Sequence, residues 1–312
     1  MKILITSTSF QDTPGKHHSF LNEKNLSVDL KRGPLTESQL LDIDWSYDGI
    51  IMGDDEYSEE VILKAKNGGL KILSKYGVGL DKVDLDAAKK HSVEVRNCPG
   101  LNFTTVAEHV FALLLSFKKN IMKEVAFTSK GEWTRLSGGE ITGKKIAIIG
   151  LGKIGKEVSR LARCFNMDIY CFDKFLDKDY VEKSGVKVIN DLNKDLKEMD
   201  IISLHCNLDS ESTGLISKEI LLNGTSDNVI LLNTARAHLV DREALHYALN
   251  EKKIGAYLAD VWYEEPMQNT DPLKDFENVL ITPHIASRTI ENVEKQGIQA
   301  IENLTNFLDG LK

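Results

Sequence analysis

The chain has 312 residues, of which 42% are hydrophobic and 28% are charged, and its formal net charge is −8. These values are ordinary for a folded globular protein, and a chain of this length forms one or two domains with buried cores. The negative charge argues against a nucleic-acid partner bound through its phosphates. The longest apolar run, residues 106–117, contains Glu108 and His109 and is too short to cross a membrane.

The cysteine pattern predicts a reducing environment. No two cysteines form a C-x-x-C pair, so we expect buried thiols in the cytoplasm rather than disulfides or a zinc site; they are Cys98, Cys164, Cys171 and Cys206. His17 and His18 are expected in a polar loop. They have no acidic or cysteine partner at metal-ligand spacing, so no metal site is predicted there.

The N-terminal third alternates short apolar runs with helical patterns. Strands are predicted at residues 2–5, 26–30, 49–52, 71–73 and 93–95. Helices are predicted at 58–66 and 85–90. Alternation of this kind is typical of βαβ units with a parallel sheet, so this third is expected to form a small α/β unit of its own.

Residues 102–121 show a single long apolar helical pattern, and residues 128–143 are polar and glycine-rich. We therefore predict one helix followed by a segment that crosses the surface. The apolar pattern exceeds what one helix face needs for its own core. This excess favours a subunit interface.

A dinucleotide-binding pattern occupies residues 145–173. A buried-strand pattern is followed by Gly150, Gly152 and Gly155 in the spacing G-x-G-x-x-G, then by a helical pattern and a second apolar run that ends in Asp173. The glycines allow a tight turn, close approach of a pyrophosphate and close helix packing. Asp173 is placed to accept hydrogen bonds from an adenosine ribose, and its charge favours NAD over NADP.

Further strands are predicted at residues 201–204, 229–232, 255–258 and 279–281, and helices at 241–249 and 288–308. A nucleotide fingerprint in mid-chain implies that its domain is inserted into the first one. We predict a substrate domain of residues 1–100 plus 288–312 and an NAD-binding domain of residues 101–287. The two crossings between them are expected to form a hinge with a ligand cleft.

Three polar clusters follow predicted strands of the second domain, at residues 233–236, 260–266 and 282–284. In parallel sheets, ligands bind outside the carboxyl ends of the strands, so these clusters can converge on one cleft. Arg236 suits a carboxylate, and His284 beside a carboxylate suits proton transfer. Taken singly, Arg236 also fits a surface ion pair, His284 a structural histidine, and Glu264 and Glu265 two solvated side chains.

The chain resembles the NAD-dependent D-2-hydroxyacid dehydrogenases over essentially its full length. The resemblance rests on YGVGLDKVDL (76–85), NCPGLNFTTVAEH (97–109), GLGKIG (150–155), NTARAHLVDREAL (233–245), DVWYEEP (260–266) and TPHIAS (282–287). It implies an α/β fold of two parallel-sheet domains of Rossmann-like or flavodoxin-like type. It also implies a homodimer with its interface near residues 106–117.

Carried onto this sequence, the family's catalytic residues fall on Arg236, Glu265 and His284. The resemblance assigns cofactor contacts to Gly150, Gly152, Lys153, Ile154, Gly155, Asp173, His205, Cys206, Thr213, Thr234, Ala235, Asp260 and Ser287. It assigns substrate contacts to Lys75, Val78, Gly79, Asn102 and Arg135. Asp260 would meet the nicotinamide amide, and the N–H groups of Val78 and Gly79 would hold the substrate carboxylate.

The implied reaction is hydride transfer between NAD and C2 of a D-2-hydroxy acid. Lys75 and Arg135, the latter supplied by a partner subunit, match cations of phosphoglycerate dehydrogenases, which favours D-3-phosphoglycerate. The acidic residues Asp54 and Asp55 argue against it. Glyoxylate or hydroxypyruvate reduction is the alternative, and an NAD-sensing, corepressor-like binding protein is an alternative of another class.

Overall fold

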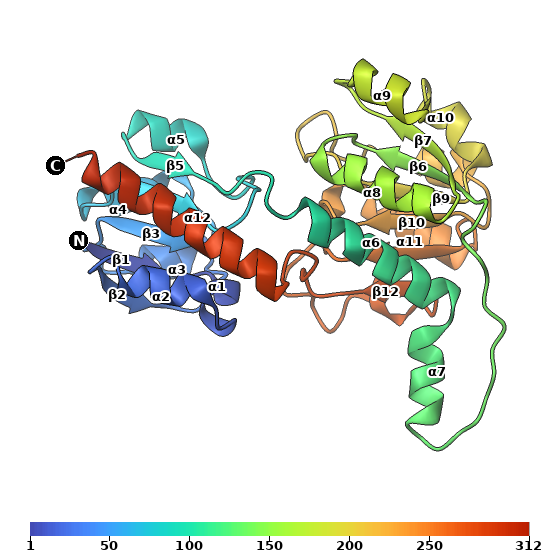
Figure 1. Ribbon diagram of the computed structural model, residues 1–312, viewed down its shortest axis with the longest axis horizontal. Helices are drawn as coiled ribbons and strands as arrows, with labels where there is room; N and C mark the ends of the chain where they lie inside the picture. Colours follow the sequence, from blue (N-terminus) through green and yellow to red (C-terminus); the bar gives the residue numbers. More distant parts are fainter. Residues whose placement is uncertain (312) are drawn as a thin grey trace. The chain divides into compact units, whose positions relative to one another are not determined.

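The structure is a computed structural model that describes residues 1–311, and it divides into two compact units. Unit 1 comprises Met1–Asn102 and the segment from Ser287 onward, and unit 2 comprises Phe103–Ala286. Each unit is a parallel α/β sheet with helices on both faces (Figure 1). The predicted fold class is therefore confirmed.

Unit 1 is built on a parallel sheet of five strands in the order β2-β1-β3-β4-β5. The strands are β1 (Lys2–Ile5), β2 (Ser27–Leu30), β3 (Gly49–Met52), β4 (Ile72–Lys75) and β5 (Glu94–Arg96). All five predicted strands are present, with bounds that differ from the predicted ones by at most two residues. The central strands β1, β3 and β4 are buried along most or all of their length, as expected for a sheet covered on both sides, whereas the edge strands β2 and β5 are exposed to half-buried.

The helices of unit 1 cover the two faces of this sheet. One face packs against α3 (Glu37–Leu41), α4 (Glu59–Asn67) and α5 (Leu85–Lys90). The other face packs against α1 (Thr8–Asp12), α2 (Lys16–Asn22) and the long α12 (Ile290–Asp309). Alternate strand residues point to opposite faces, so Leu4 and Ile50 join the first core while Ile3 and Ile51 join the second.

The helix that closes unit 1 comes from the far end of the sequence. The Ser74 hydroxyl of β4 donates to the Ala300 carbonyl of α12 over 2.8 Å, and both groups are buried.

The prediction that His17 and His18 lie in a polar loop is wrong, because they lie on α2 and His17 is fully buried. Its Nε2 contacts the Phe10 carbonyl at 3.0 Å, and the two rings pack edge to face.

Unit 2 has a parallel sheet of seven strands in the order β12-β11-β10-β9-β6-β7-β8. The strands are β6 (Lys145–Ile149), β7 (Asp168–Phe172), β8 (Lys187–Val188), β9 (Ile201–Leu204), β10 (Ile230–Asn233), β11 (Ala256–Ala259) and β12 (Val279–Ile281). β6 lies between β9 and β7, so the segments after these two strands flank the turn that follows β6. This order places the predicted nucleotide turn at the switch point of the sheet.

Helices also cover both faces of the sheet in unit 2. α6 (Phe103–Lys118) and α8 (Lys153–Cys164) pack on one core, and α10 (Leu192–Asp195) and α11 (Arg242–Asn250) pack on the other. α9 (Lys178–Ser184) follows β7. The helix predicted at residues 241–249 is confirmed as α11. Asp241 caps its N-terminus, because the Asp241 carboxylate accepts from the Ala244 N–H over 2.9 Å.

The prediction of one helix over residues 102–121 is wrong. α6 ends at Lys118, and α7 (Ile121–Thr128) begins after Asn120, whose φ of 55° is left-handed and breaks the helical path. The apolar side chains of α6 are used by its own unit, since Val110, Phe111 and Leu114 are buried in the core. The exposed apolar surface lies instead on α7, which stands away from the sheet of unit 2 (Figure 1).

The expectation of four buried thiols is wrong for Cys164, which lies exposed on α8. Cys98 and Cys171 are buried, and Cys206 is half-buried. All four are free thiols. Among residues 1–311, no helix has both the length and the apolar content that crossing a membrane requires.

Candidate active site

The glycine turn after β6 has the geometry that a pyrophosphate site requires. Gly150 has a φ of 99°, and a Cβ there would lie 2.5 Å from the Cys206 nitrogen. A Cβ at Gly155 would lie 2.0 Å from the Gly150 carbonyl oxygen, so α8 packs against the turn only because position 155 is glycine. A Cβ at Gly152 would meet no atom within 4 Å, so the protein itself does not require glycine there. This open space lies beside the N-terminus of α8, which has no side-chain cap. Its free N–H groups fit a bound phosphate group.

Lys153 and Ile154 form the first turn of α8 beside this space. Their backbone N–H groups belong to the set that has no partner inside a helix, and the positive end of the helix dipole lies there. The chemistry of the turn therefore fits the diphosphate of a dinucleotide, and the individual contacts stay predictions.

Asp173 follows β7 directly and is held by the backbone. Its Oδ2 accepts from the Leu151 N–H over 2.6 Å, and its Oδ1 accepts from the Phe175 N–H over 2.7 Å. The first bond ties the acidic residue to the glycine turn. The carboxylate is thereby fixed at the edge of the sheet where the resemblance places a ribose.

Five further predicted cofactor residues of unit 2 follow β9 and β10. Thr234 has a buried hydroxyl without a hydrogen-bond partner among the described residues, which fits a missing ligand. His205 contacts the Ser203 hydroxyl at 2.7 Å, and burial lowers the pKa of this imidazole to about 3, so the ring is neutral. Burial raises the pKa of the Cys206 thiol to about 11. Ala235 is half-buried, and Thr213 donates to the Asp209 carbonyl over 2.8 Å.

Arg236 is carried by a tight turn at the end of β10. The buried Asn233 amide donates to the Arg236 carbonyl over 2.9 Å, and the Asn233 Oδ1 accepts from the Ala235 N–H over 3.0 Å. The Arg236 guanidinium donates to the Ala235 carbonyl over 2.8 Å. Asn233 therefore positions Arg236. We did not predict this role for the Asn233 side chain, although Asn233 is the first residue of the polar cluster at 233–236.

His284 and Glu265 form a direct hydrogen-bonded pair. The His284 Nδ1 donates to the Glu265 Oε2 over 2.7 Å, and the Glu265 Oε1 accepts from the Trp262 N–H over 2.8 Å. Both side chains are about one-third exposed. The carboxylate thus fixes the orientation of the ring and places its proton on Nδ1. Glu264, the preceding residue, lies 4.0 Å from Arg242.

Three of the four predicted substrate residues of unit 1 lie at the end of β4 or just after it. The Lys75 ammonium is only 5% exposed and donates to the Gly53 carbonyl and to Asp54 Oδ1, both over 2.5 Å. This pairing counts against a phosphate contact by Lys75. The exposed Val78 and the half-buried Gly79 lie in the loop after β4. Two hydrogen bonds hold this loop: the Asn97 amide donates to the Val78 carbonyl, and the Cys98 N–H donates to the Gly77 carbonyl.

The remaining predicted residues lie near the unit boundaries or on the surface. Asn102 is the last residue of the first segment of unit 1, and Ser287 is the first residue of the second, where its carbonyl accepts from the Asn292 amide over 2.5 Å. Arg135 is exposed in the segment between α7 and β6. Among residues 1–311, no group of three or more histidine, cysteine or acidic side chains is arranged to hold a metal ion.

Comparison with known proteins identifies the family. Residues 111–286 match the family model described as "D-isomer specific 2-hydroxyacid dehydrogenase, NAD binding domain", which is more than half of the chain. The chain belongs to this family. Unit 2, with its glycine turn, is therefore an NAD-binding domain of the D-2-hydroxyacid dehydrogenase type.

Individual relatives agree with this assignment. The chain is 33% identical over 314 residues to a D-3-phosphoglycerate dehydrogenase of Archaeoglobus fulgidus, a match that covers 100% of this chain and 58% of that protein. It is 34% identical over 247 residues to a glyoxylate reductase of Korarchaeum cryptofilum, covering 77% of this chain and 74% of that protein. The apo-structure of D-lactate dehydrogenase from Escherichia coli superimposes with a TM-score of 0.86 at 28% identity, over 99% of this chain and 98% of that one. The chain thus spans about three-fifths of the length of the first of these relatives.

Next to the His284 loop lies a buried network that we did not predict as a whole. Asp260 is 1% exposed and accepts from the Thr282 hydroxyl over 2.6 Å and from the Ile285 and Ala286 N–H groups over 2.9 and 2.7 Å. His109 of α6 contacts the Thr282 hydroxyl at 2.9 Å. Burial raises the pKa of Asp260, but hydrogen bonds from His109, Thr282 and the backbone outweigh it and hold the pKa below its usual value.

This network explains an unusual backbone conformation. His284 has a φ of 54°, which is rare for a residue other than glycine and is found where surrounding bonds impose it. The Ile285 and Ala286 N–H groups donate to Asp260 and so fix the loop on the C-terminal side of the histidine. The predicted contact of Asp260 with the nicotinamide amide stays a prediction.

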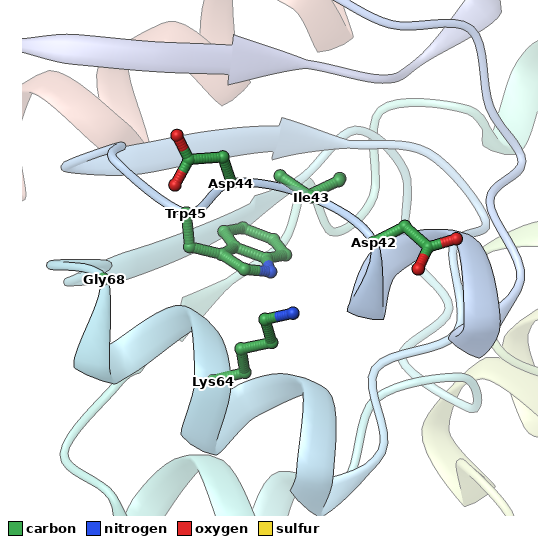
Figure 2. A pocket seen from close by; sticks show the side chains of 6 residues that line it. All are labelled: Asp42, Ile43, Asp44, Trp45, Lys64 and Gly68. Carbon is green, nitrogen blue, oxygen red and sulfur yellow. The ribbon is translucent and has the colours of Figure 1, made fainter.

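A separate hollow of about 380 Å³ lies on unit 1 (Figure 2). It is lined by Asp42, Ile43, Asp44, Trp45, Lys64 and Gly68. These residues precede β3 and β4 in the chain, at the amino ends of the strands. Ligands of parallel sheets bind at the carboxyl ends, so this hollow is not part of the candidate active site.

Proposed function

We propose that this dehydrogenase transfers a hydride between NAD and C2 of a D-2-hydroxy acid. The observation that carries the proposal is the 2.7 Å hydrogen bond between His284 and Glu265, in a domain whose family binds NAD. A histidine oriented by a carboxylate is a proton carrier matched to the hydroxyl and keto forms of such a substrate. NAD, when bound, supplies or accepts the hydride.

The roles of the residues follow from their chemistry. Arg236 would hold the substrate carboxylate in a bidentate fork and polarise the C2 oxygen. His284 would take the hydroxyl proton at Nε2 during oxidation and return it during reduction, while Glu265 stabilises the charged ring. The N–H groups of Val78 and Gly79 would donate to the carboxylate. The turn at 150–155 and Asp173 would bind the dinucleotide.

For the substrate, we favour D-3-phosphoglycerate. Support comes from the relatives named D-3-phosphoglycerate dehydrogenase, which match 99–100% of the chain in two cases. The Lys75–Asp54 pair weakens one of the two predicted cations, and Arg135 remains as the second. Glyoxylate or hydroxypyruvate is the alternative, because a relative of similar identity is a glyoxylate reductase.

The free cysteines support a cytoplasmic location.

Turnover with a panel of acids tests this function. NADH absorbance is followed with D-3-phosphoglycerate, D-glycerate, hydroxypyruvate, glyoxylate and pyruvate. We expect reaction with D-2-hydroxy acids and their keto forms, and the highest kcat/KM with the phosphorylated acid. A higher kcat/KM with glyoxylate would move the assignment to the reductase. Tight NADH binding without turnover of any acid would favour the corepressor-like alternative.

We also propose that the protein is a homodimer. α7 exposes Ile121, Met122 and Val125 on the solvent side of an eight-residue helix. An exposed apolar group of this kind is typical of an interface. In sedimentation velocity we expect a dimer, and Met122→Glu should raise its dissociation constant at least about tenfold. Lys130→Glu, just beyond α7, is the control. An active monomer at working concentration would contradict the proposal.

A further inference from the structure

The segments that follow β7 and β9 lie on either side of the glycine turn, because β6 is between these strands. After β7 come Asp173 and then Lys174, and after β9 comes a loop that contains Glu211. In this fold the adenosine end of a dinucleotide binds at such a crevice. Charged side chains of both segments therefore bear on which nucleotide the site accepts.

Lys174 and Glu211 join the two segments. The Lys174 ammonium donates to the Glu211 Oε2, and this bond raises the pKa of Lys174. The two residues come from strands that are not neighbours in the sheet, so their ion pair links the two sides of the crevice beside the turn. The ammonium next to Asp173 in the chain is thereby neutralised.

The loop that carries Glu211 is internally braced. The Asp209 Oδ1 accepts from the Glu211 and Ser212 N–H groups over 2.9 and 2.8 Å, and the Ser212 hydroxyl donates to the Asn207 carbonyl over 2.8 Å. Backbone hydrogen bonds from Ser212 and Glu211 lower the pKa of Asp209. Glu211 is thus presented to Lys174 by a preformed turn.

We infer that Glu211 is a specificity-determining residue for the cofactor, because it holds Lys174 away from the 2′-phosphate that distinguishes NADP from NAD. The inference rests on the proposed NAD site. Asp173 alone repels a 2′-phosphate, but a free lysine beside it would offset that repulsion. With Glu211 in place, the charge of the Lys174 ammonium is balanced by the Glu211 carboxylate, and Asp209 adds to the negative charge near it.

Nucleotide binding without any substrate tests this inference. Dissociation constants for NADH and NADPH are measured by the fluorescence of the bound nucleotide, in the unmodified protein and in Glu211→Gln. Glu211→Gln should tighten NADPH binding about tenfold and change NADH binding less than twofold. The double variant Glu211→Gln with Lys174→Ala should lose that gain, since the gain requires the released ammonium.

Glu198→Gln is the matched control. Glu198 accepts from Lys145 over 2.7 Å in another exposed lysine–glutamate pair of unit 2, at the amino end of β6. This variant should leave the ratio of the two dissociation constants unchanged. An unchanged ratio in Glu211→Gln, or a gain that persists in the double variant, would overturn the inference while leaving the proposed NAD site intact. Failure of the unmodified protein to bind NADH would overturn both.

Discussion

His284→Ala is expected to lower kcat about a thousandfold in both directions while the dissociation constant for NADH changes less than twofold. The imidazole is the only group in the proposed mechanism that exchanges a proton with the C2 oxygen, and such groups contribute factors of about 10² to 10⁴. Its ring is held by Glu265, and the glycine turn is built from residues 150–155, so we expect the nucleotide site to keep its structure. The measurements are steady-state turnover and NADH fluorescence titration.

His246→Ala is the control for that experiment. His246 is an exposed residue of α11 in the same unit, and its ring packs against Phe276 with centroids 5.4 Å apart. This variant should retain its turnover. Turnover in His284→Ala within tenfold of the unmodified enzyme would assign the proton transfer to another group.

Glu265→Gln is expected to move both pH limbs of the reaction downward by about one unit, because it removes the negative charge 2.7 Å from the imidazole. A neighbouring carboxylate favours the charged ring, so its loss lowers the pKa of His284. Reduction requires the imidazolium, and its activity should therefore disappear at a lower pH on the alkaline side. Oxidation requires the neutral ring, and its activity should extend to a lower pH on the acid side. The measurement is kcat/KM against pH in each direction.

Glu264→Gln provides the matched control, since Glu264 is the preceding residue and lies near Arg242 instead of His284. It should leave both pH profiles in place. A shift in Glu264→Gln, or unchanged profiles in Glu265→Gln, would show that the orienting carboxylate had been assigned to the wrong residue. Because both variants keep the size of the side chain, a difference between them reports charge and hydrogen bonding rather than packing.

The substrate preference and the reaction type depend on different residues. The proposed acid–base pair, His284 and Glu265, lies in unit 2. The cations predicted to bind a substrate phosphate are Lys75 of unit 1 and Arg135 of unit 2. Lys75 is committed to Asp54 and the Gly53 carbonyl. The panel of acids can therefore change the assigned substrate without changing the roles of His284 and Glu265.

Local patterns determined much of this protein from the sequence alone. Apolar runs with glycine and acidic ends are local features, so the strand order along the chain and the glycine turn were predictable, and Gly150 and Gly155 have the close contacts expected of them. The choice of Glu265 over Glu264 came from the motif resemblance. The fold class followed from the alternation of strands and helices.

Tertiary structure alone decided the remaining features, because they depend on which distant groups meet. The burial of His17 under α12 and the pairing of Lys75 with Asp54 have no local signal. Asp260 shows the same principle: its carboxylate holds residues 22 to 26 positions later in the chain, and so fixes the loop of His284. Hydrogen bonds over such separations depend on the sheet order, which a sequence pattern does not contain.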